Sequence, residues 1–77
     1  MTLQDVLKDA FNMKDSEYTD TQSLMQLEDW DSMSHMVFIT QLEEVFDVEL
    51  SGDEIISLET IGDVKKLLDR KGKTEKI

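Results

Sequence analysis

Apolar positions recur with helical spacing in three parts of the chain. The first stretch predicts a helix over about residues 3–12. Its apolar face consists of Leu3, Val6, Leu7, Ala10 and Phe11. Thr2, just ahead of this face, and Asp5, three residues later, have the spacing of a capping box, in which each side chain binds the other residue's backbone N–H. The sequence therefore predicts both the helix and its first residues.

A second amphipathic stretch predicts a helix over residues 32–46. Its core face consists of Phe38, Ile39, Leu42, Val45 and Phe46. The opposite face is apolar as well near its beginning, where it carries Met33, Met36 and Val37. An apolar patch outside the core face indicates a contact surface for a partner. The alternative is that the preceding loop folds over these three side chains and buries them.

The rest of the chain completes a small bundle. A short helix is expected at residues 51–57 and a last helix from Thr60, which forms a capping-box pair with Asp63. The apolar face of the last helix consists of Ile61, Val64, Leu67 and Leu68. Gly72 follows and is expected to mark its end. Residues 13–31 show no sustained period and predict a long loop, pinned to the core by Leu24 and Leu27.

The predicted fold class is therefore all-α, with three main helices, one short helix and a long loop between the first two main helices. The chain has 77 residues, enough for one modest core. We expect one helical domain over residues 1–70. Residues 71–77 are expected to form a basic, frayed C-terminal tail.

Charge narrows the classes of partner. Residues 1–64 hold sixteen acidic and two basic residues, a net −14, whereas residues 65–77 hold two acidic and six basic residues, a net +4. Such an acidic body repels nucleic acid and anionic membranes and favours basic protein surfaces. The chain has no cysteine, no apolar run of membrane-spanning length and no signal-peptide pattern at its start, so we expect a cytoplasmic monomer.

Metal sites and catalysis have little support in the sequence. An EF-hand register beginning at Asp47 fails, because Leu58 stands where the bidentate glutamate is required. His35 is the only histidine, and we expect it to make a half-buried polar contact. A hydrolase triad of Ser32, His35 and Asp31 is disfavoured, since a chain of this size leaves little room for an oxyanion hole and a pocket.

Ser32 itself allows two interpretations. A serine at the start of a helix is commonly its N-cap. A phosphate ester on this hydroxyl would instead lie near the positive end of the helix dipole. Asp31 would then be mildly repulsive, and it makes better sense as a recognition element for a modifying enzyme than as a contribution to stability.

The residues around Ser32 resemble a known family. Asp31-Ser32-Met33 is similar to the Asp-Ser-Leu attachment motif of acyl carrier proteins. The stretches QLEEVFDVEL (residues 41–50), SGDEI (51–55) and LETIGDVKKLL (58–68) resemble further parts of that family, and the loop of 19 residues before the serine also fits. The resemblance covers residues 2–70.

This resemblance implies a non-catalytic carrier. A phosphopantetheinyl transferase would move 4′-phosphopantetheine from coenzyme A to Ser32, and the thiol of that arm would carry an acyl group as a thioester. The docking surface for acyl-loading and acyl-processing enzymes, with their basic patches, would comprise Asp31, Met33, Met36, Val37, Glu43 and Glu44. The helical core would be able to receive the acyl chain.

Departures from the family pattern point towards a particular use. Ser34 and Val37 stand where carriers of primary fatty acid synthesis usually have acids, Met33 replaces the usual leucine, and Trp30 stands where a smaller residue is common. We therefore expect a carrier for a specialised pathway, with a polyketide, a modified lipid or sugar, or an aminoacyl group as cargo. The alternatives are the primary fatty acid carrier and, from another class, an unmodified acidic adaptor.

Overall fold

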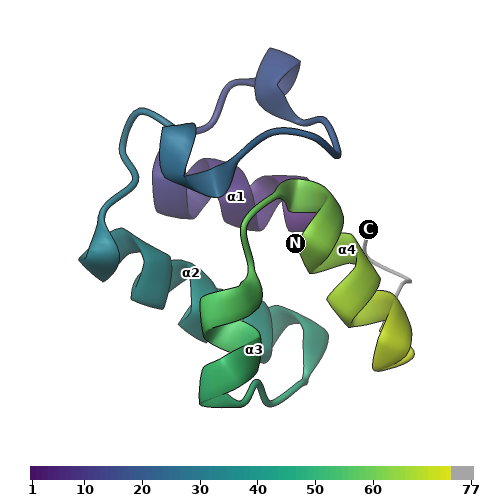
Figure 1. Cartoon of the computed structure of the whole chain (residues 1–77). Helices are drawn as coiled ribbons and strands as arrows, with labels where there is room; N and C mark the ends of the chain where they lie inside the picture. The colour runs from purple at the N-terminus through teal and green to yellow at the C-terminus, as the bar shows by residue number, and fades with distance from the viewer. Residues whose placement is uncertain (74–77) are drawn as a thin grey trace.

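The computed structural model describes residues 1–73 and is built from helices in the order that the sequence predicts (Figure 1). Its elements are α1 (Leu3–Phe11), two 3₁₀ turns η1 (Asp15–Glu17) and η2 (Leu24–Gln26), α2 (Ser32–Phe46), α3 (Gly52–Ser57) and α4 (Ile61–Arg70). The all-α prediction is confirmed. The two 3₁₀ turns, which the sequence analysis did not predict, lie within the segment predicted as a long loop. Each main helix begins and ends within about two residues of its predicted bounds.

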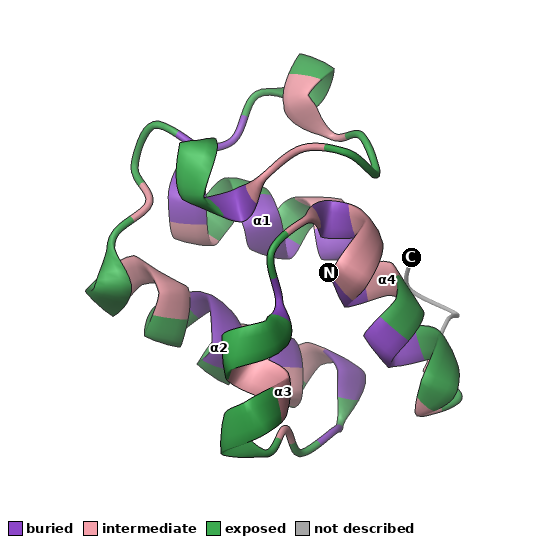
Figure 2. Ribbon diagram, viewed as in Figure 1, coloured by how far each residue is buried: buried purple, intermediate pink, exposed green. Residues whose placement is uncertain are grey.

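One apolar core lies where the helices meet (Figure 2). The predicted faces of α1 and α4 point into it, together with Phe38, Ile39, Leu42 and Phe46 of α2. The rings of Phe11 and Phe38 lie 5.2 Å apart at their centroids and join α1 to α2. Val45, which the sequence places on the core face, packs against the core but is only half-buried.

Local capping explains where the helices begin and end. The predicted boxes of Thr2 with Asp5 and of Thr60 with Asp63 are both present. The N–H groups of Gly72 and Lys73 bind the carbonyls of Asp69 and Leu68, and Gly72 has φ +72°. This is the Schellman arrangement, so the predicted stop at Gly72 is confirmed. The predicted fraying of the tail concerns in part residues 74–77, which lie outside the described residues.

The long loop is tied to the beginning of α4 by backbone hydrogen bonds. Leu24 N–H donates to the carbonyl of Glu59, Ile61 N–H to that of Gln22, and Gly62 N–H to that of Asp20, at 2.8, 3.1 and 2.9 Å. In Figure 1 the loop accordingly passes beside the first turn of α4. Leu24 and Leu27 are buried as predicted, and Met13 adds a third apolar anchor that the sequence analysis did not find. The loop therefore has a defined path, which delivers residues 30–32 to the start of α2.

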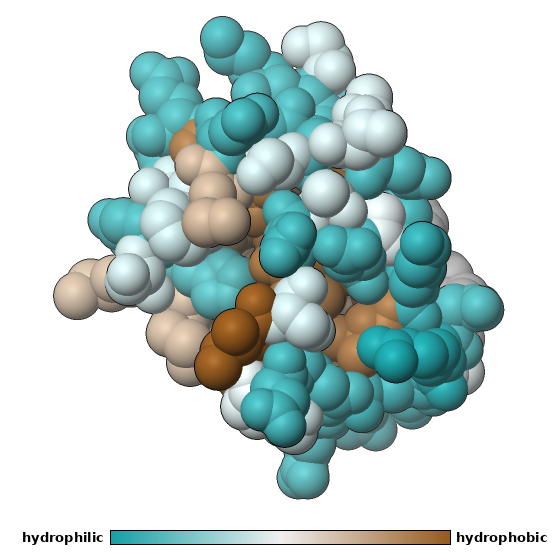
Figure 3. All heavy atoms as spheres, in the orientation of Figure 1, coloured by the Kyte–Doolittle hydropathy of each residue, from teal (hydrophilic) through white to brown (hydrophobic). Residues whose placement is uncertain are grey.

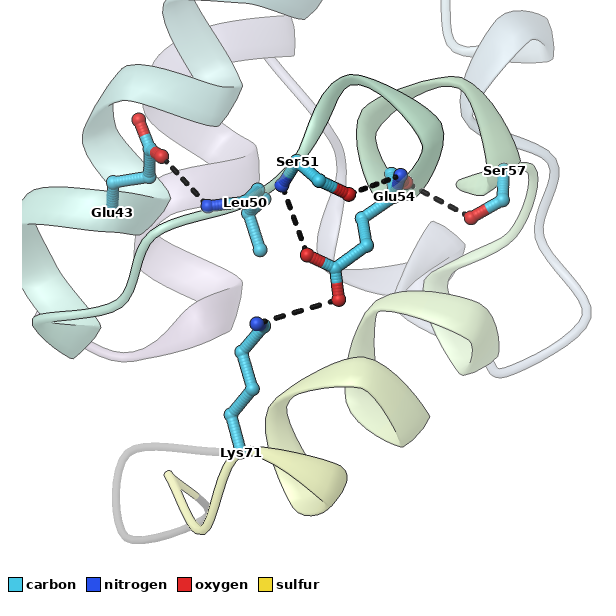
Figure 4. Close-up of polar contacts among 6 residues, drawn as sticks. All are labelled: Glu43, Leu50, Ser51, Glu54, Ser57 and Lys71. Atoms are coloured by element: carbon cyan, nitrogen blue, oxygen red, sulfur yellow. Dashed lines mark hydrogen bonds and ion pairs between the residues drawn. The ribbon is translucent and has the colours of Figure 1, made fainter.

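Polar contacts hold α3, which buries none of its residues (Figure 4). A carboxylate oxygen of Glu43 accepts the N–H of Leu50 at 2.9 Å, which fixes the segment ahead of α3. Ser51 and Glu54 form a capping box, and Glu54 also pairs with Lys71 at 3.3 Å. The backbone N–H of Ser51 is the main cause that holds the pKa of Glu54 below its ordinary value, and Lys71 adds to it. These contacts attach α3 to both α2 and the end of α4.

Candidate functional site

Ser32 is the first residue of α2, and Asp31 is its N-cap. Oδ1 of Asp31 accepts the backbone N–H of Ser34 at 2.7 Å, and the hydroxyl of Ser34 accepts the N–H of Asp31 at 2.8 Å. The interpretation of Ser32 as N-cap is therefore wrong, because the preceding residue has the extended backbone and the side-chain bond that define a cap. Asp31 therefore caps α2 in the unmodified protein, and its role in recognition by a modifying enzyme stays a prediction.

The capping box leaves the hydroxyl of Ser32 unengaged. Ser32 is exposed, and its hydroxyl takes part in no hydrogen bond with the described residues. Ser34, only two positions away, has its hydroxyl bound between Asp31 and the carbonyl of Asp29. The Ser34 N–H, followed by the Ser34 side chain, holds the pKa of Asp31 below its ordinary value, so this cap is anionic at neutral pH. Of these two serines, Ser32 is the one whose hydroxyl is exposed and unengaged within the described residues.

A groove of about 350 Å³ lies beside Ser32. Ser32, His35 and Met36 of α2 line it together with residues of η2, the long loop, α3 and the segment between α3 and α4: Met25, Trp30, Ile55, Ile56, Leu58 and Glu59. Leu58 is buried, whereas Met25, Met36 and Ile56 are 57 %, 49 % and 81 % exposed. Figure 3 shows the corresponding hydrophobic patch over α3 among hydrophilic surroundings. The groove can accommodate an apolar group that is attached close to Ser32.

Trp30 and His35 form a hydrogen-bonded chain along this groove. Nε1 of Trp30 donates to Nδ1 of His35 at 3.3 Å, and Nε2 of His35 lies 3.4 Å from the carbonyl oxygen of Ile55. The two rings meet edge to face with centroids 6.0 Å apart. The predicted half-buried polar contact of His35 is confirmed. Its partners could not be found from the sequence, because one is a backbone carbonyl twenty residues away.

The predicted docking residues lie on two neighbouring parts of α2. Met33 and Val37 are 78 % and 46 % exposed, so the alternative that the loop buries the outer face of α2 is wrong. Met36 borders the 350 Å³ groove, whereas Met33 and Val37 border a second hollow of about 260 Å³ with Ala10. The sequence analysis treated these three side chains as one surface, whereas in the structure they border two separate hollows.

The two predicted acidic docking residues have different surroundings. Glu44 is exposed, whereas Glu43 is half-buried and accepts the N–H of Leu50 (Figure 4). Glu43 therefore has a structural task at the end of α2, and a docking role for either residue stays a prediction.

The described part of the chain contains neither a cluster of metal-ligating side chains nor a helix that could span a membrane. Within residues 1–73 no group of three or more histidine or acidic side chains is arranged to hold a metal ion. Ser51 and Gly52, which an EF-hand would use within its loop, instead cap and begin α3. No helix among these residues is long and apolar enough to cross a bilayer.

Comparison with known proteins decides the family. The model of the phosphopantetheine attachment site family matches residues 2–68. The chain belongs to the acyl carrier protein family. It is 33 % identical over 61 residues to a protein named acyl carrier protein from Lactobacillus acidophilus, a match that covers 79 % of this chain and 76 % of that relative. The predicted resemblance is thereby confirmed.

Membership defines the general role of this carrier. Its prosthetic group is 4′-phosphopantetheine, attached covalently. The family consists of carriers rather than catalysts, and the domain implies contacts with a phosphopantetheinyl transferase and with biosynthetic enzymes. The residues at the start of α2 fit such a group, since an exposed, unengaged serine hydroxyl lies beside an apolar groove.

Proposed function

We propose that Ser32 carries the 4′-phosphopantetheine arm and that the protein delivers acyl groups bound to it as thioesters. The observation that carries this proposal is the unengaged hydroxyl of Ser32, set one residue after a cap that uses Asp31 and Ser34 instead. In the transfer, the Ser32 oxygen forms a bond to phosphorus and loses its proton, while the adenosine bisphosphate part of coenzyme A leaves. The phosphodiester anion then lies near the positive end of α2, which stabilises it.

We further propose that partners approach the surface formed by Asp31, Met33, Met36, Val37, Glu43 and Glu44. Exposure of the three apolar side chains supports this surface, because isolated exposed residues are ordinary but a cluster indicates a contact. Basic patches on acyl-loading and acyl-processing enzymes would meet the acidic body, residues 1–64, which carries a net charge of −14. We also propose that the protein acts as a monomer in the cytoplasm, binds no nucleic acid and catalyses no reaction itself.

The cargo that we propose belongs to a specialised pathway: a polyketide, a modified lipid or sugar, or an aminoacyl group. Support comes from Ser34 and Val37, which stand where carriers of primary fatty acid synthesis usually have acids, so that the surface around Ser32 is less acidic. The apolar hollow that Met33 and Val37 border supports it as well. Partners of the primary fatty acid carrier would meet a less acidic surface here. A loading screen with labelled precursors tests this point: efficient malonyl loading and chain extension by fatty acid synthase enzymes would contradict it.

The second candidate is an unmodified acidic adaptor that docks through α2. Ser32→Ala in the producing cell separates the two. A carrier loses all function with this variant, because no arm can be attached, whereas an adaptor keeps it. The structure makes the variant a clean test, since Ser32 is not the cap and alanine is a better helix former than serine. Normal function of Ser32→Ala would therefore favour the adaptor.

A further inference from the structure

The wall of the groove formed by α3 is held more weakly than the walls formed by the other helices. This helix has six residues and buries none of them, and so short a helix is not stable by itself. Its polar tethers to other helices are the Glu54–Lys71 pair at 3.3 Å and the contact between His35 and Ile55 at 3.4 Å. Elements with few buried apolar contacts open most readily. Ile55 alone of these six residues packs against the core, and it is only partly buried, so the position of α3 depends on these tethers as well as on that contact.

The contact with His35 fills a gap in the hydrogen bonding of α3. The carbonyl of Ile55 belongs to the last turn of the helix, where no intrahelical donor is available. The N–H four residues further on, that of Glu59, is bound instead to Oδ2 of Asp63 at 3.2 Å. The partner of this carbonyl is instead Nε2 of His35, on α2. The bond gives α3 an attachment to α2 directly beside the groove.

Trp30 determines which nitrogen of His35 can donate. An indole N–H can only donate, so Nδ1 of His35, which receives it at 3.3 Å, must be the acceptor. In the neutral ring the proton is then on Nε2, the nitrogen that faces Ile55. The hydrogen bonds of both rings are satisfied by each other and by α3. The surface that remains for a ligand in the groove is mostly apolar.

We propose that Trp30 and His35 form a latch that keeps α3 against α2 and so sets the width of the groove beside Ser32. With the latch closed, the groove shelters a slender apolar chain that fits about 350 Å³. Its width then determines which acyl cargo is protected from water and from nucleophiles. This part rests on the proposed attachment of the arm to Ser32, whereas the latch itself is a property of the unmodified chain. His35 and Trp30 act here as positioning residues.

Two substitutions of His35 separate the two halves of the latch. The amide nitrogen of His35→Gln can reach the place of Nε2 and donate to Ile55, whereas the shorter His35→Asn reaches only the place of Nδ1 and leaves Ile55 without a donor. Amide hydrogen exchange of the unmodified protein is the first measurement. For His35→Asn we expect exchange of residues 55–57 to rise about three- to tenfold, the effect of losing one ordinary hydrogen bond. For His35→Gln we expect rates close to wild type.

Controls within the same experiment keep the latch falsifiable. Exchange in α1 should stay unchanged in both variants, because the latch acts on α3 alone. Trp30→Phe, which keeps a ring but removes the N–H that fixes the tautomer, should raise exchange of residues 55–57 less than His35→Asn does. Equal exchange in the Asn and Gln variants would overturn the latch. An equal rise in α1 and α3 would overturn it as well, since it would indicate global destabilisation.

The cargo is tested separately on the modified protein. In the wild type, hydroxylamine should cleave an octanoyl thioester more slowly than an acetyl thioester, because the longer chain lies in the groove. The ratio of the acetyl rate to the octanoyl rate should therefore exceed one in wild type, fall towards one in His35→Asn and be retained in His35→Gln. A ratio unaffected by either variant would refute the role of the latch in cargo selection. If no arm can be attached at all, the proposed function fails, and the exchange data still decide the latch.

Discussion

Replacing Gly62 by alanine should destabilise the protein, although alanine is the better helix former. Gly62 lies in the first turn of α4, where its N–H binds the carbonyl of Asp20 at 2.9 Å. A Cβ at this position would lie 2.8 Å from the same carbonyl oxygen, whereas ordinary contacts of a Cβ begin at 3.4 Å. The oxygen cannot move away cheaply, because the bonds of Gln22 and Leu24 just after it, and the pairing of the Asp20 side chain with Lys65, tie this part of the loop to the start of α4.

The opposing effects can be compared in size. Overpacking of this kind costs about 1–3 kcal/mol, and weakening the Gly62–Asp20 hydrogen bond adds about 0.5–1.5 kcal/mol. Alanine returns at most about 1 kcal/mol through its helix propensity. We therefore expect the free energy of unfolding to fall by about 1–3 kcal/mol. In a domain of this size each kcal/mol corresponds to a fall in Tm of about 4–8 °C.

Gly52 provides a matched control. It is the first residue of α3, and a Cβ there would meet nothing within 4 Å. Gly52→Ala should leave stability unchanged or raise it by up to about 1 kcal/mol. Urea unfolding followed by circular dichroism at 222 nm measures both variants. Gly62→Ala at or above the stability of wild type would refute the reasoning, and so would equal losses in the two variants.

Three further predictions concern the core, the cap and the charge. Phe38→Ala should cost about 3–5 kcal/mol and leave the chain largely unfolded in circular dichroism, because Phe38 is fully buried against Phe11. Asp31→Asn keeps a cap but removes its charge, and the pKa of Asp31 is lowered in the folded state. Wild type should therefore have the larger free energy of unfolding above the ordinary pKa of 3.8, and the difference should disappear as pH falls through the lowered pKa. Urea titrations at several pH values measure this difference. Mg²⁺ and salt should raise Tm by relieving repulsion among the acids, and a Tm indifferent to both would contradict this.

Periodicity and capping patterns were sufficient to predict the main helices. The faces of α1 and α4 alternate with the helical period, and Thr2 and Thr60 each stand three residues before an aspartate. Local chemistry of this kind depends on residues close in the chain, so the sequence displays it directly. The cap of α2 is Asp31, whereas one interpretation of the sequence placed it at Ser32, because serine and aspartate are equally good caps and stand side by side.

The groove and the path of the loop could not be predicted in the same way. The loop is held by carbonyls of Asp20, Gln22 and Glu59, and backbone groups carry no residue signature. Trp30 was noticed only as a large residue in an unusual place, and its partner His35 binds a carbonyl of α3. Such contacts depend on how distant elements pack. The lone histidine three residues after Ser32 suggested a half-buried polar contact and gave no indication of the groove.

The proposed docking surface on α2 could likewise be predicted only in part from the sequence. The exposed positions of Met33, Met36 and Val37 follow from the helical projection, because they lie away from the core face of α2. Their division between two hollows depends on which side chains of α1 and α3 stand next to them. A partner that inserts one apolar side chain can therefore use either hollow, and Met33→Ala and Met36→Ala should affect different partners if each enzyme uses only one.

The most direct test of the central claim is the intact mass of the protein after incubation with coenzyme A and a broad-specificity phosphopantetheinyl transferase. Ser32→Ala and Ser34→Ala serve as the paired variants, because the hydroxyl of Ser34 is engaged in the cap while that of Ser32 is free. We predict a gain of one phosphopantetheine on wild type and on Ser34→Ala, and none on Ser32→Ala. A gain on Ser32→Ala, or no gain on folded wild type with an active enzyme control, would contradict the account.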